Sequence, residues 1–476
     1  AAALVAPWTS APAPLAAPIQ PEIVREFQGV TERDVVALGI NVTPPDTMGA
    51  VGLDHVVEFV NGALAIYGKD GVRQSIKRDS QFWLDAGISA ATLTPGVSDP
   101  RITFDPTVNR WFATEITKSS TSNRVLIARS DSADPTGVWK ATSYIASGTL
   151  FADYDTLGVD ATNIYVGTNN FNRATGQLVS LGMAVLPKSD ILAATPTLAN
   201  SALFLDTNGA IGFTPRGVTN YSTNPGHGVL MAVDAFQWKT TDRITVTGSG
   251  TSTALSAVTS IATTYDAANG PINPPQPGGT SIDVIDDRYT GEIRQVGDNI
   301  YMTNTVISDG RDAVHWLVIS ESTNAIVGEG LIADPAFDFL QPSIGVGDGG
   351  TFLLTFNRVG TTAGTGNIGI WGAVGTTAPG SITVDAPFLI RSGTVSNYTG
   401  PSFDTGVSKR WGDYSATVAD PTVRGLYWSF QEIPLTSTEW STRITAIYVP
   451  EPSTWALALT GVIAAAWGAI ERRRRA

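Results

Sequence analysis

Acidic and basic side chains recur along the chain directly ahead of short apolar segments of the kind that form strands. The acidic candidates for a binding site are Asp46, Asp99, Asp153 and Asp413, and similar positions are held by Arg101, Asp155 and Arg288. If a repeat gathers them around one axis, the carboxylates could hold a hard cation such as Ca²⁺ or orient the hydroxyl groups of a sugar. The alternative, which we favour, is structural, with each aspartate accepting backbone N–H groups of a neighbouring unit. The pattern therefore requires no cofactor.

The arginines point to another chemistry, the hydrolysis of glycosidic bonds. A sialidase-type site needs three arginines that grip a carboxylate, a tyrosine nucleophile and an acidic partner. Residues of these types at suitable positions are Arg101, Glu115, Arg288, Tyr289, Arg410 and Tyr414. Arg101, Glu115 and Arg288 are the candidate catalytic residues of this alternative, although nothing in the sequence fixes their geometry.

Other sites are less well supported by the sequence. The three histidines, His55, His227 and His315, lack metal-ligand spacing, and His315 lies on an apolar segment, where a core position is expected. The acidic group Asp283, Asp286 and Asp287 could bind Ca²⁺ in a loop, but a solvated acidic turn is the simpler interpretation.

Two kinds of strand-like segment alternate along the body of the chain and define a repeat. Copies of the first kind, which pair a small or apolar strand with an aromatic strand, begin at Ala50, Ile102, Leu157, Gln295, Ser343 and Ser415. Copies of the second kind begin at Arg124, Leu181, Val229, His315, Ile368 and Thr442. A period of about 50 residues or more with about four strands per unit is typical of a β-propeller, in which each blade buries both faces against its neighbours.

We therefore predict an all-β fold, with one β-propeller over residues 21–448. A weak first half between Ala202 and Tyr221 would bring the count to seven blades, while six or eight stay open because insertions such as Thr251–Gly279 blur the spacing. The dipeptide Asn61-Gly62 between two apolar runs predicts a hairpin whose turn needs positive φ.

One turn has a recognisable motif. The segment from Ser132 to Trp139 resembles the Asp-box of sialidase-like propellers, with one extra residue between Asp134 and Gly137. The motif predicts a hairpin turn in which Asp134 accepts backbone N–H groups, Gly137 takes a positive φ and Trp139 packs beneath. Its role is structural.

Several phrases in the first half of the chain resemble a family of bacterial secreted propeller proteins whose activity is mostly uncharacterised. They are Pro44-Pro45-Asp46-Thr47, Asp99-Pro100 with Phe104-Asp105 and Arg110-Trp111, Asp134-Pro135-Thr136-Gly137, and Asp153-Tyr154 with Ile164-Tyr165. The second half matches only in pattern. The resemblance implies the fold rather than a function.

The last 28 residues, 449–476, have three parts. A rigid Pro450-Glu451-Pro452 segment precedes an apolar run from Trp455 to Ile470, and a block of cations closes the chain at Arg472, Arg473, Arg474 and Arg475. The run suits a single transmembrane helix of about 24 Å whose flanking arginines stay on the cytoplasmic side of the inner membrane, with the body outside.

This tail resembles the PEP-CTERM sorting signal of Gram-negative bacteria that make extracellular polysaccharide. The resemblance implies cleavage near Pro450-Glu451-Pro452 by the membrane enzyme exosortase and delivery of the body to the cell surface or matrix. A permanent single-span anchor is the alternative. An Ala/Pro-rich segment at residues 1–20 reads as a signal-peptide remnant or a linker.

Composition limits the partners. The chain has 30 basic and 43 acidic residues and a net charge of −13; since residues 449–476 carry four arginines and two glutamates, the remainder stands at −15. A body this acidic is not suited to bind nucleic acid. We therefore predict an exported β-propeller with a binding or structural role linked to exopolysaccharide; the alternatives are a secreted sialidase-like glycoside hydrolase acting on extracellular glycan and a Ca²⁺-stabilised adhesin.

Overall fold

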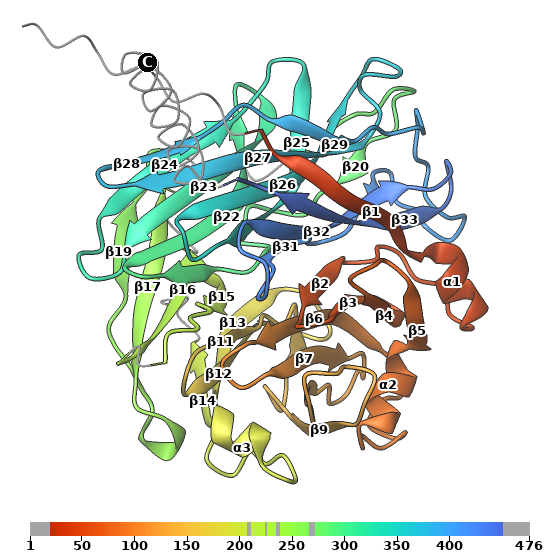
Figure 1. Cartoon of the computed structure of the whole chain (residues 1–476). Helices are drawn as coiled ribbons and strands as arrows, with labels where there is room; N and C mark the ends of the chain where they lie inside the picture. Colours follow the sequence, from red (N-terminus) through yellow and green to blue (C-terminus); the bar gives the residue numbers. More distant parts are fainter. Residues whose placement is uncertain (1–19, 207–210, 224–225, 235–238, 266–271, 451–476) are drawn as a thin grey trace, which may run out of the picture.

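Seven antiparallel sheets of four or five strands surround a common axis in the described part of the chain (Figure 1). The computed structural model describes residues 20–206, 211–223, 226–234, 239–265 and 272–450. The protein is thus a seven-bladed β-propeller, and the predicted all-β fold and blade count are confirmed. The C-terminal run and arginine block, with the first 19 residues, lie outside the described residues.

Blades 1 to 3 follow the chain outward from the axis, each as an up-and-down meander. Blade 1 contains β2 (Met48–Val51), β3 (His55–Val60), β4 (Ala63–Gly68) and β5 (Arg73–Arg78). Blade 2 contains β6 (Val97–Asp105), β7 (Arg110–Thr117), β8 (Val125–Ser130) and β9 (Trp139–Tyr144). Blade 3 contains β10 (Phe151–Asp153), β11 (Gly158–Val159), β12 (Asn163–Phe171), β13 (Leu178–Pro187) and β14 (Ala202–Asp206).

Blades 4 to 6 repeat the arrangement with longer outer strands or loops. Blade 4 contains β15 (Phe213–Gly217), β16 (Gly228–Val233), β17 (Thr240–Thr247), β18 (Ala254–Leu255) and β19 (Thr259–Ala262). Blade 5 contains β21 (Arg294–Val296), β22 (Asn299–Ser308), β23 (Arg311–Ser320) and β24 (Ile326–Ile332). Blade 6 contains β25 (Phe337–Val346), β26 (Thr351–Gly360), β27 (Gly369–Ala378), β28 (Ser381–Val384) and β29 (Phe388–Arg391).

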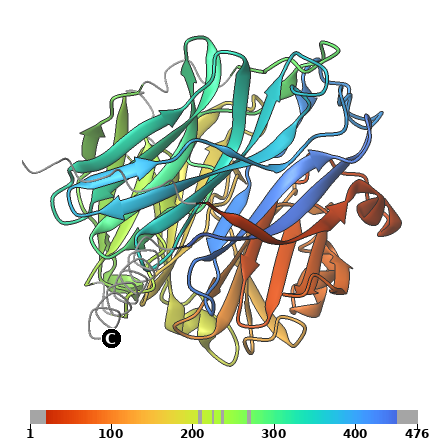
Figure 2. The ribbon, with the colours of Figure 1, turned by 45° about the horizontal axis from the view of Figure 1, so that its top comes forward.

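Blade 7 joins the two ends of the chain and closes the ring. Its inner strands are β31 (Ala416–Ala419), β32 (Leu426–Pro434) and β33 (Trp440–Tyr448), and its outermost strand is β1 (Glu22–Thr31). β1 pairs antiparallel with β33 from Glu22 opposite Tyr448 to Thr31 opposite Ser441, so Figure 2 shows the red and dark blue strands side by side. This pairing fastens the first described strand to the last.

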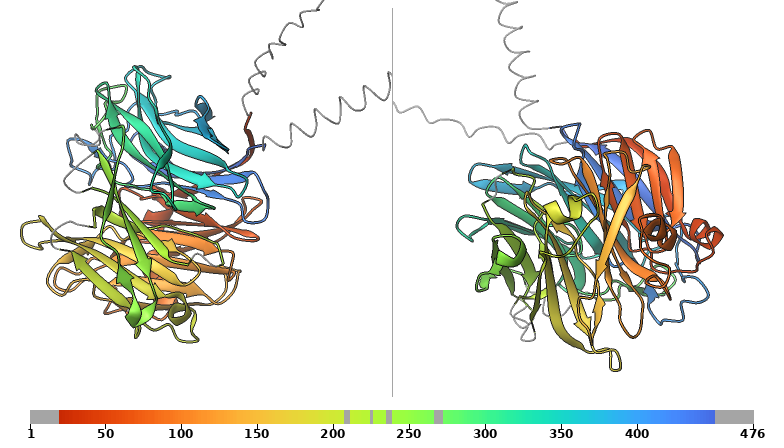
Figure 3. Two further views of the ribbon diagram at one scale, coloured as in Figure 1. Left: turned by 90° about the vertical axis from the view of Figure 1, so that its left-hand side faces the viewer. Right: turned by 90° about the horizontal axis from the view of Figure 1, so that it is seen from below.

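Short helices lie outside the sheets, at the periphery of the propeller (Figures 1 and 3). They are α1 (Glu32–Ala37), α2 (Asp79–Asp85) and α3 (Lys188–Leu192). α1 begins with a reciprocal capping box between Thr31 and Asp34, which satisfies backbone N–H groups that a first turn leaves free. No helix among the described residues has the length and apolarity needed to span a membrane.

Aromatic and branched side chains fill the space between blades. Trp83, Trp111, Trp411, Trp428 and Trp440 are almost fully buried, and such side chains supply large apolar contact areas to a core built without disulfides. His315 is also buried, as predicted, at 3 % exposure.

The local predictions have mixed outcomes. Gly62 has φ 92° in the turn between β3 and β4, which confirms the hairpin. In the Asp-box segment, Asp134 accepts the N–H of Thr136 at 2.9 Å and Trp139 is buried, but the expected positive φ at Gly137 is wrong. The turn nevertheless closes, since the N–H of Asp131 donates to the carbonyl of Val138 at 2.8 Å.

Candidate functional site

The innermost strands are kinked where they begin. Non-glycine residues with left-handed backbone stand there in several blades, among them Asp46, Asp99, Tyr154, Thr214 and Gln341, with φ between 49° and 63°. The ladders of β6, β15 and β25 shift register at the same points, as in a β-bulge. We call this end of the axis the leading mouth, and the end where the innermost strands finish the trailing mouth.

The kinks turn side chains onto the backbone of the adjacent blade. Arg101 Nε donates to the carbonyl of Asp155 at 2.8 Å, and Thr156 Oγ1 donates to the carbonyl of Pro215 at 2.9 Å. Thr290 Oγ1 continues the pattern by donating to the carbonyl of Pro342 at 3.2 Å. The wall of the channel is therefore held together by bonds between consecutive blades.

Two of the predicted aspartates make the same kind of bond at the leading mouth. Asp46 in blade 1 accepts the backbone N–H of Asp413 in blade 7 at 2.7 Å, and Asp99 in blade 2 accepts that of Tyr154 in blade 3 at 3.0 Å. Asn61 lies between them: its amide nitrogen donates to Asp46 Oδ2 at 2.8 Å, and its amide oxygen accepts the N–H of Asp99 at 3.0 Å. Binding of a ligand by these carboxylates stays a prediction.

Burial and mutual repulsion disfavour ionisation of this group. Burial raises the pKa of Asp153 to about 7, with the charge of Asp99 adding to the effect. Burial likewise raises the pKa of Asp413 to about 6, and raises that of Asp46 well above its usual range, where the charges of Asp413 and Asp99 also contribute. Within the described ranges, no group of three or more His, Asp or Glu side chains is arranged to hold a metal ion.

Arg101 closes the axis below this mouth. Its guanidinium carbon lies 3.4 Å from the ring centre of Tyr414 and 4.8 Å from that of Tyr154, and the side chain is fully buried. Besides its bond to blade 3, it donates to the carbonyl of Thr290 in blade 5 at 3.3 Å and lies 3.9 Å from the sulfur of Met48 in blade 1. A side chain from blade 2 that contacts blades 1, 3, 5 and 7 must cross the centre of the channel.

The other residues predicted for a sialidase-type site are engaged elsewhere. Arg288 stacks 4.0 Å over the ring of Tyr154 but is paired with Asp286, and Arg410 pairs with Asp413 at 2.6 Å. Glu115 is fully buried and accepts the indole N–H of Trp83, and its pKa is well above the usual range because of burial.

The tyrosines predicted beside the arginines are likewise bonded within the protein. Tyr289 donates to Thr241 at 2.9 Å, and Tyr414 donates to the carbonyl of Pro100 at 3.0 Å. Arg101 and Arg288 both stack on the ring of Tyr154. Glu115 and Tyr289 are bonded to other residues, Trp83 and Thr241.

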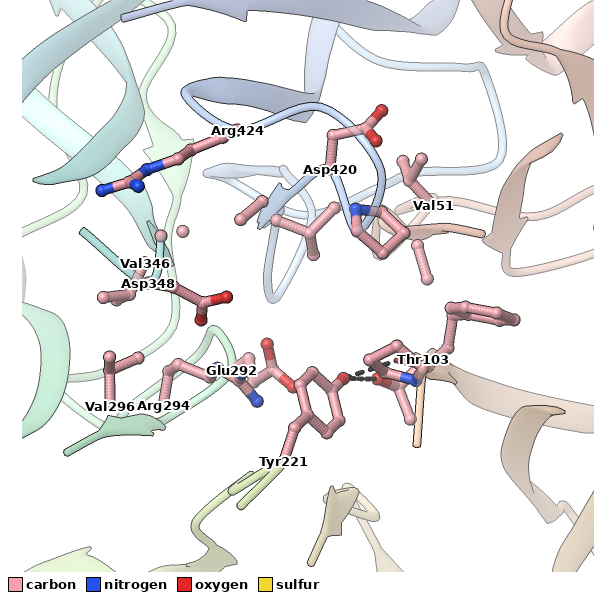
Figure 4. Close-up of a pocket in the computed structure, with 18 of the residues that line it drawn as sticks. Val51, Thr103, Tyr221, Glu292, Arg294, Val296, Val346, Asp348, Asp420 and Arg424 are labelled. Atoms are coloured by element: carbon pink, nitrogen blue, oxygen red, sulfur yellow. Dashed lines mark hydrogen bonds between the residues drawn. The ribbon is translucent and has the colours of Figure 1, made fainter. Parts of the chain in front are cut away.

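A cavity of about 750 Å³ opens at the trailing mouth, a volume typical of small-molecule sites. Its walls come from the ends of the innermost strands and the turns after them in blades 1, 2, 4, 5, 6 and 7. The side chains that give it chemical character are Thr103, Tyr221, Glu292, Arg294, Asp348, Asp420 and Arg424 (Figure 4).

Arg294 and Tyr221 form a shelf in this cavity. The guanidinium carbon of Arg294 stands 3.7 Å from the centre of the Tyr221 ring, and Arg294 is only 8 % exposed. The hydroxyl of Tyr221 donates to the carbonyl of Phe104 at 2.8 Å, which fixes the ring. Burial raises the pKa of Tyr221, with the charge of Glu292 contributing, so this phenol stays protonated at neutral pH.

Two carboxylates face the same space. Figure 4 shows the carboxyl groups of Glu292, which is half-buried, and Asp348, which is exposed, pointing into the cavity. Neither has a hydrogen bond or an ion pair to another side chain in the described part of the chain. Asp420 differs, because it is held by Lys69 at 2.9 Å and by the indole N–H of Trp428 at 2.9 Å, and so belongs to the wall.

The residues of the trailing mouth were not among those predicted from the sequence, because they share no one position relative to a strand. Glu292 precedes the short strand β21, Arg294 is the first residue of that strand, and Asp348 lies in the turn after β25. For Asp348, a polar residue just after an innermost strand was the available signal, but the same residue types also occur in ordinary turns.

Comparisons with solved structures give matches at low sequence identity. The sequence matches no protein-family model, and no curated protein matches it. The fold resembles the extracellular domains 1–2 of Drosophila semaphorin 1b, at 7 % identity over 90 % of this chain and 87 % of that chain, with a TM-score of 0.38. It also resembles Trypanosoma rangeli sialidase, at 11 % identity over 73 % of this chain, with a TM-score of 0.33. A third similar structure is phage phi92 endosialidase, at 9 % identity over 72 % of this chain and 66 % of that chain, with a TM-score of 0.38. The chain spans 54 % of the length of the T. rangeli sialidase, and likeness at this level says nothing about activity.

Proposed function

We propose that the protein is an exported β-propeller that binds exopolysaccharide or another surface glycan through the cavity at the trailing mouth. The observation that carries this proposal is the grouping of unpaired acceptors, Glu292 and Asp348, with an enclosed donor, Arg294, around one open space. Sugars present hydroxyl groups that donate to carboxylates and accept from guanidinium groups, so they can satisfy both kinds of partner at once.

The proposal includes the sorting route. The tail supports export by its order of parts, with Pro450-Glu451-Pro452 before an apolar run and an arginine block, and exosortase is the processing partner that this order implies. Replacing Arg472 to Arg475 by alanine removes the charges that hold the tail on the cytoplasmic side. The variant is expected to remain uncleaved or be mislocalised, as judged by its mass and by surface labelling of cells. Unchanged mature mass and surface display would contradict this route.

A second candidate function is glycoside hydrolysis at the same cavity. It is favoured by the presence of two carboxyl groups, Glu292 and Asp348, in one polar cavity, because most glycosidases act with such a pair. The leading mouth offers less support, since Arg288 and Arg410 are paired with aspartates.

One experiment separates the two functions. The full chain is incubated with the exopolysaccharide of the producing cell, and both co-sedimentation and newly released reducing sugar are measured. Binding without release above a heat-killed control is expected for the first function. Release that disappears in Glu292→Gln and in Asp348→Asn, while co-sedimentation persists, would establish the hydrolase instead. If the protein shows no binding and releases no sugar, the cavity is excluded as a site for this glycan.

A further inference from the structure

The cavity at the trailing mouth is closed at its inner end. β6 runs from its walls, at Thr103, back to Arg101, which fills the axis between blades 1, 3, 5 and 7. Tyr414 crosses the same level, because it belongs to blade 7 and its hydroxyl donates to the carbonyl of Pro100 in blade 2. A polymer that enters from the trailing mouth therefore cannot pass through the propeller, so an end of the chain fits the cavity better than its middle.

Arg294 needs an oxygen acceptor that the protein does not supply. Its Nη1 is enclosed without a hydrogen-bond partner, and no carboxylate of the described residues lies within ion-pair distance of it. The guanidinium is over nine-tenths buried and lies on an aromatic ring, so it has lost most of its hydration. An N–H donor left without an acceptor in such a place costs free energy. Because Arg294 lines the cavity, its guanidinium is placed to donate to a ligand oxygen there.

The charges select among glycans. Among the described residues, the cavity lining carries three carboxylates, Glu292, Asp348 and Asp420, against two cations, the enclosed Arg294 and the exposed Arg424. The lining is therefore acidic on balance, and the part of the chain before residue 449 carries a net charge of −15. An acidic polysaccharide would be repelled over a distance by the body and locally by this lining. A neutral sugar avoids both penalties, because its hydroxyl groups donate to the carboxylates while its oxygens accept from Arg294.

Resting on the proposed function, we propose that the trailing-mouth cavity recognises the terminal units of a neutral glycan chain, with Arg294 on the Tyr221 shelf as the donor and Glu292 and Asp348 as the acceptors. The closed axis favours a chain end as the bound part, and the balance of charges favours a neutral glycan. The residues of the leading mouth take no part.

The test uses exopolysaccharide of the producing cell, separated by anion exchange into a neutral and an acidic fraction. Part of each fraction is cut by mild acid into shorter chains, so that equal masses differ in their number of ends. Binding of the full chain is measured by isothermal titration calorimetry. The neutral fraction is expected to bind, and the protein bound at saturation per mass of glycan is expected to rise in proportion to the number of ends.

Variants test the named residues. Arg294→Gln and Asp348→Asn are each expected to weaken binding by about tenfold or more, as the loss of one hydrogen bond to a charged group predicts. Arg33→Gln, at an arginine that is 65 % exposed on α1, is the matched control and should bind as the parent does. Asp348 is exposed in a turn, so its substitution keeps the test valid if Arg294→Gln fails to fold.

The contrary outcomes are distinct. Preference for the acidic fraction, a stoichiometry independent of chain ends, or unchanged affinity in both cavity variants would overturn this inference while leaving glycan binding in place. Absence of binding to every fraction would overturn the proposed function as well.

Discussion

At the scale of single residues, burial decides the chemistry of Glu115. Its pKa lies well above 4.5 because the carboxyl group is desolvated in blade 2, so the folded protein keeps it protonated while the unfolded chain ionises it. This difference lowers the stability of the parent protein as pH rises above about 4.5, by about 1.4 kcal/mol per pH unit until the folded pKa is reached. Glu115→Gln cannot ionise and keeps an acceptor for Trp83. We expect its free energy of unfolding, relative to the parent, to increase between pH 5 and pH 8.

Urea unfolding at the two pH values measures this difference. Glu22→Gln makes the same substitution at an exposed position of β1 and is the control. If Glu115→Gln instead becomes relatively less stable at pH 8, the carboxylate is ionised in the folded protein, and its interpretation as a neutral core residue fails.

At the scale of elements, one buried ion pair connects blade 2 to the start of α3. Lys188 Nζ lies 2.6 Å from Asp105 Oδ2, and both side chains are almost fully buried. Lys188→Met keeps the aliphatic length but leaves the Asp105 carboxylate without its cation, so a loss of about 3–5 kcal/mol in unfolding free energy is expected. The double variant with Asp105→Asn should recover part of that loss. Urea denaturation of the single and double variants measures both, and a loss below about 1 kcal/mol in Lys188→Met would show that solvent reaches the pair.

The strands and turns also show how much of the structure can be predicted from the sequence. Alternation and turn residues such as Asn61-Gly62 act over a few neighbouring positions, and they predicted the strands, a hairpin and the seven blades. The second role of Asn61, which binds both Asp46 and Asp99, depends on how blades 1 and 2 meet and has no local signal. The trailing-mouth cavity was missed for the same reason, since Tyr221, Glu292 and Asp348 come together only after three blades are placed around the axis.

At the scale of the whole molecule, closing seven blades around one axis collects carboxyl groups in the interior. Asp105 is matched by a cation, but the pKa values of others are raised, mainly by burial, to about 7 for Glu58 and Asp153, about 8 for Asp155 and Asp312, and about 6 for Asp413. The propeller thus differs from proteins whose interior carboxylates are all stabilised by cations. Its free energy of unfolding should therefore increase as pH falls over part of the pH range.

The direction of this pH dependence follows from the linkage between proton binding and folding. Between pH 8 and about pH 5 the folded protein binds protons at these five groups that the unfolded chain releases, so the free energy of unfolding should rise as pH falls, by about 1.4 kcal/mol per pH unit for each group that is titrating. Below about pH 4 the trend should reverse, because the pKa values of Asp420 and Glu329 are lowered by hydrogen bonds to Lys69 and His315 that outweigh burial. Urea midpoints measured at pH 8, 7, 6, 5 and 3.5 would trace a maximum near pH 5. A stability that is flat or that falls from pH 8 to pH 5 would mean that these interior groups are ionised in the folded propeller and that their charges are balanced within it.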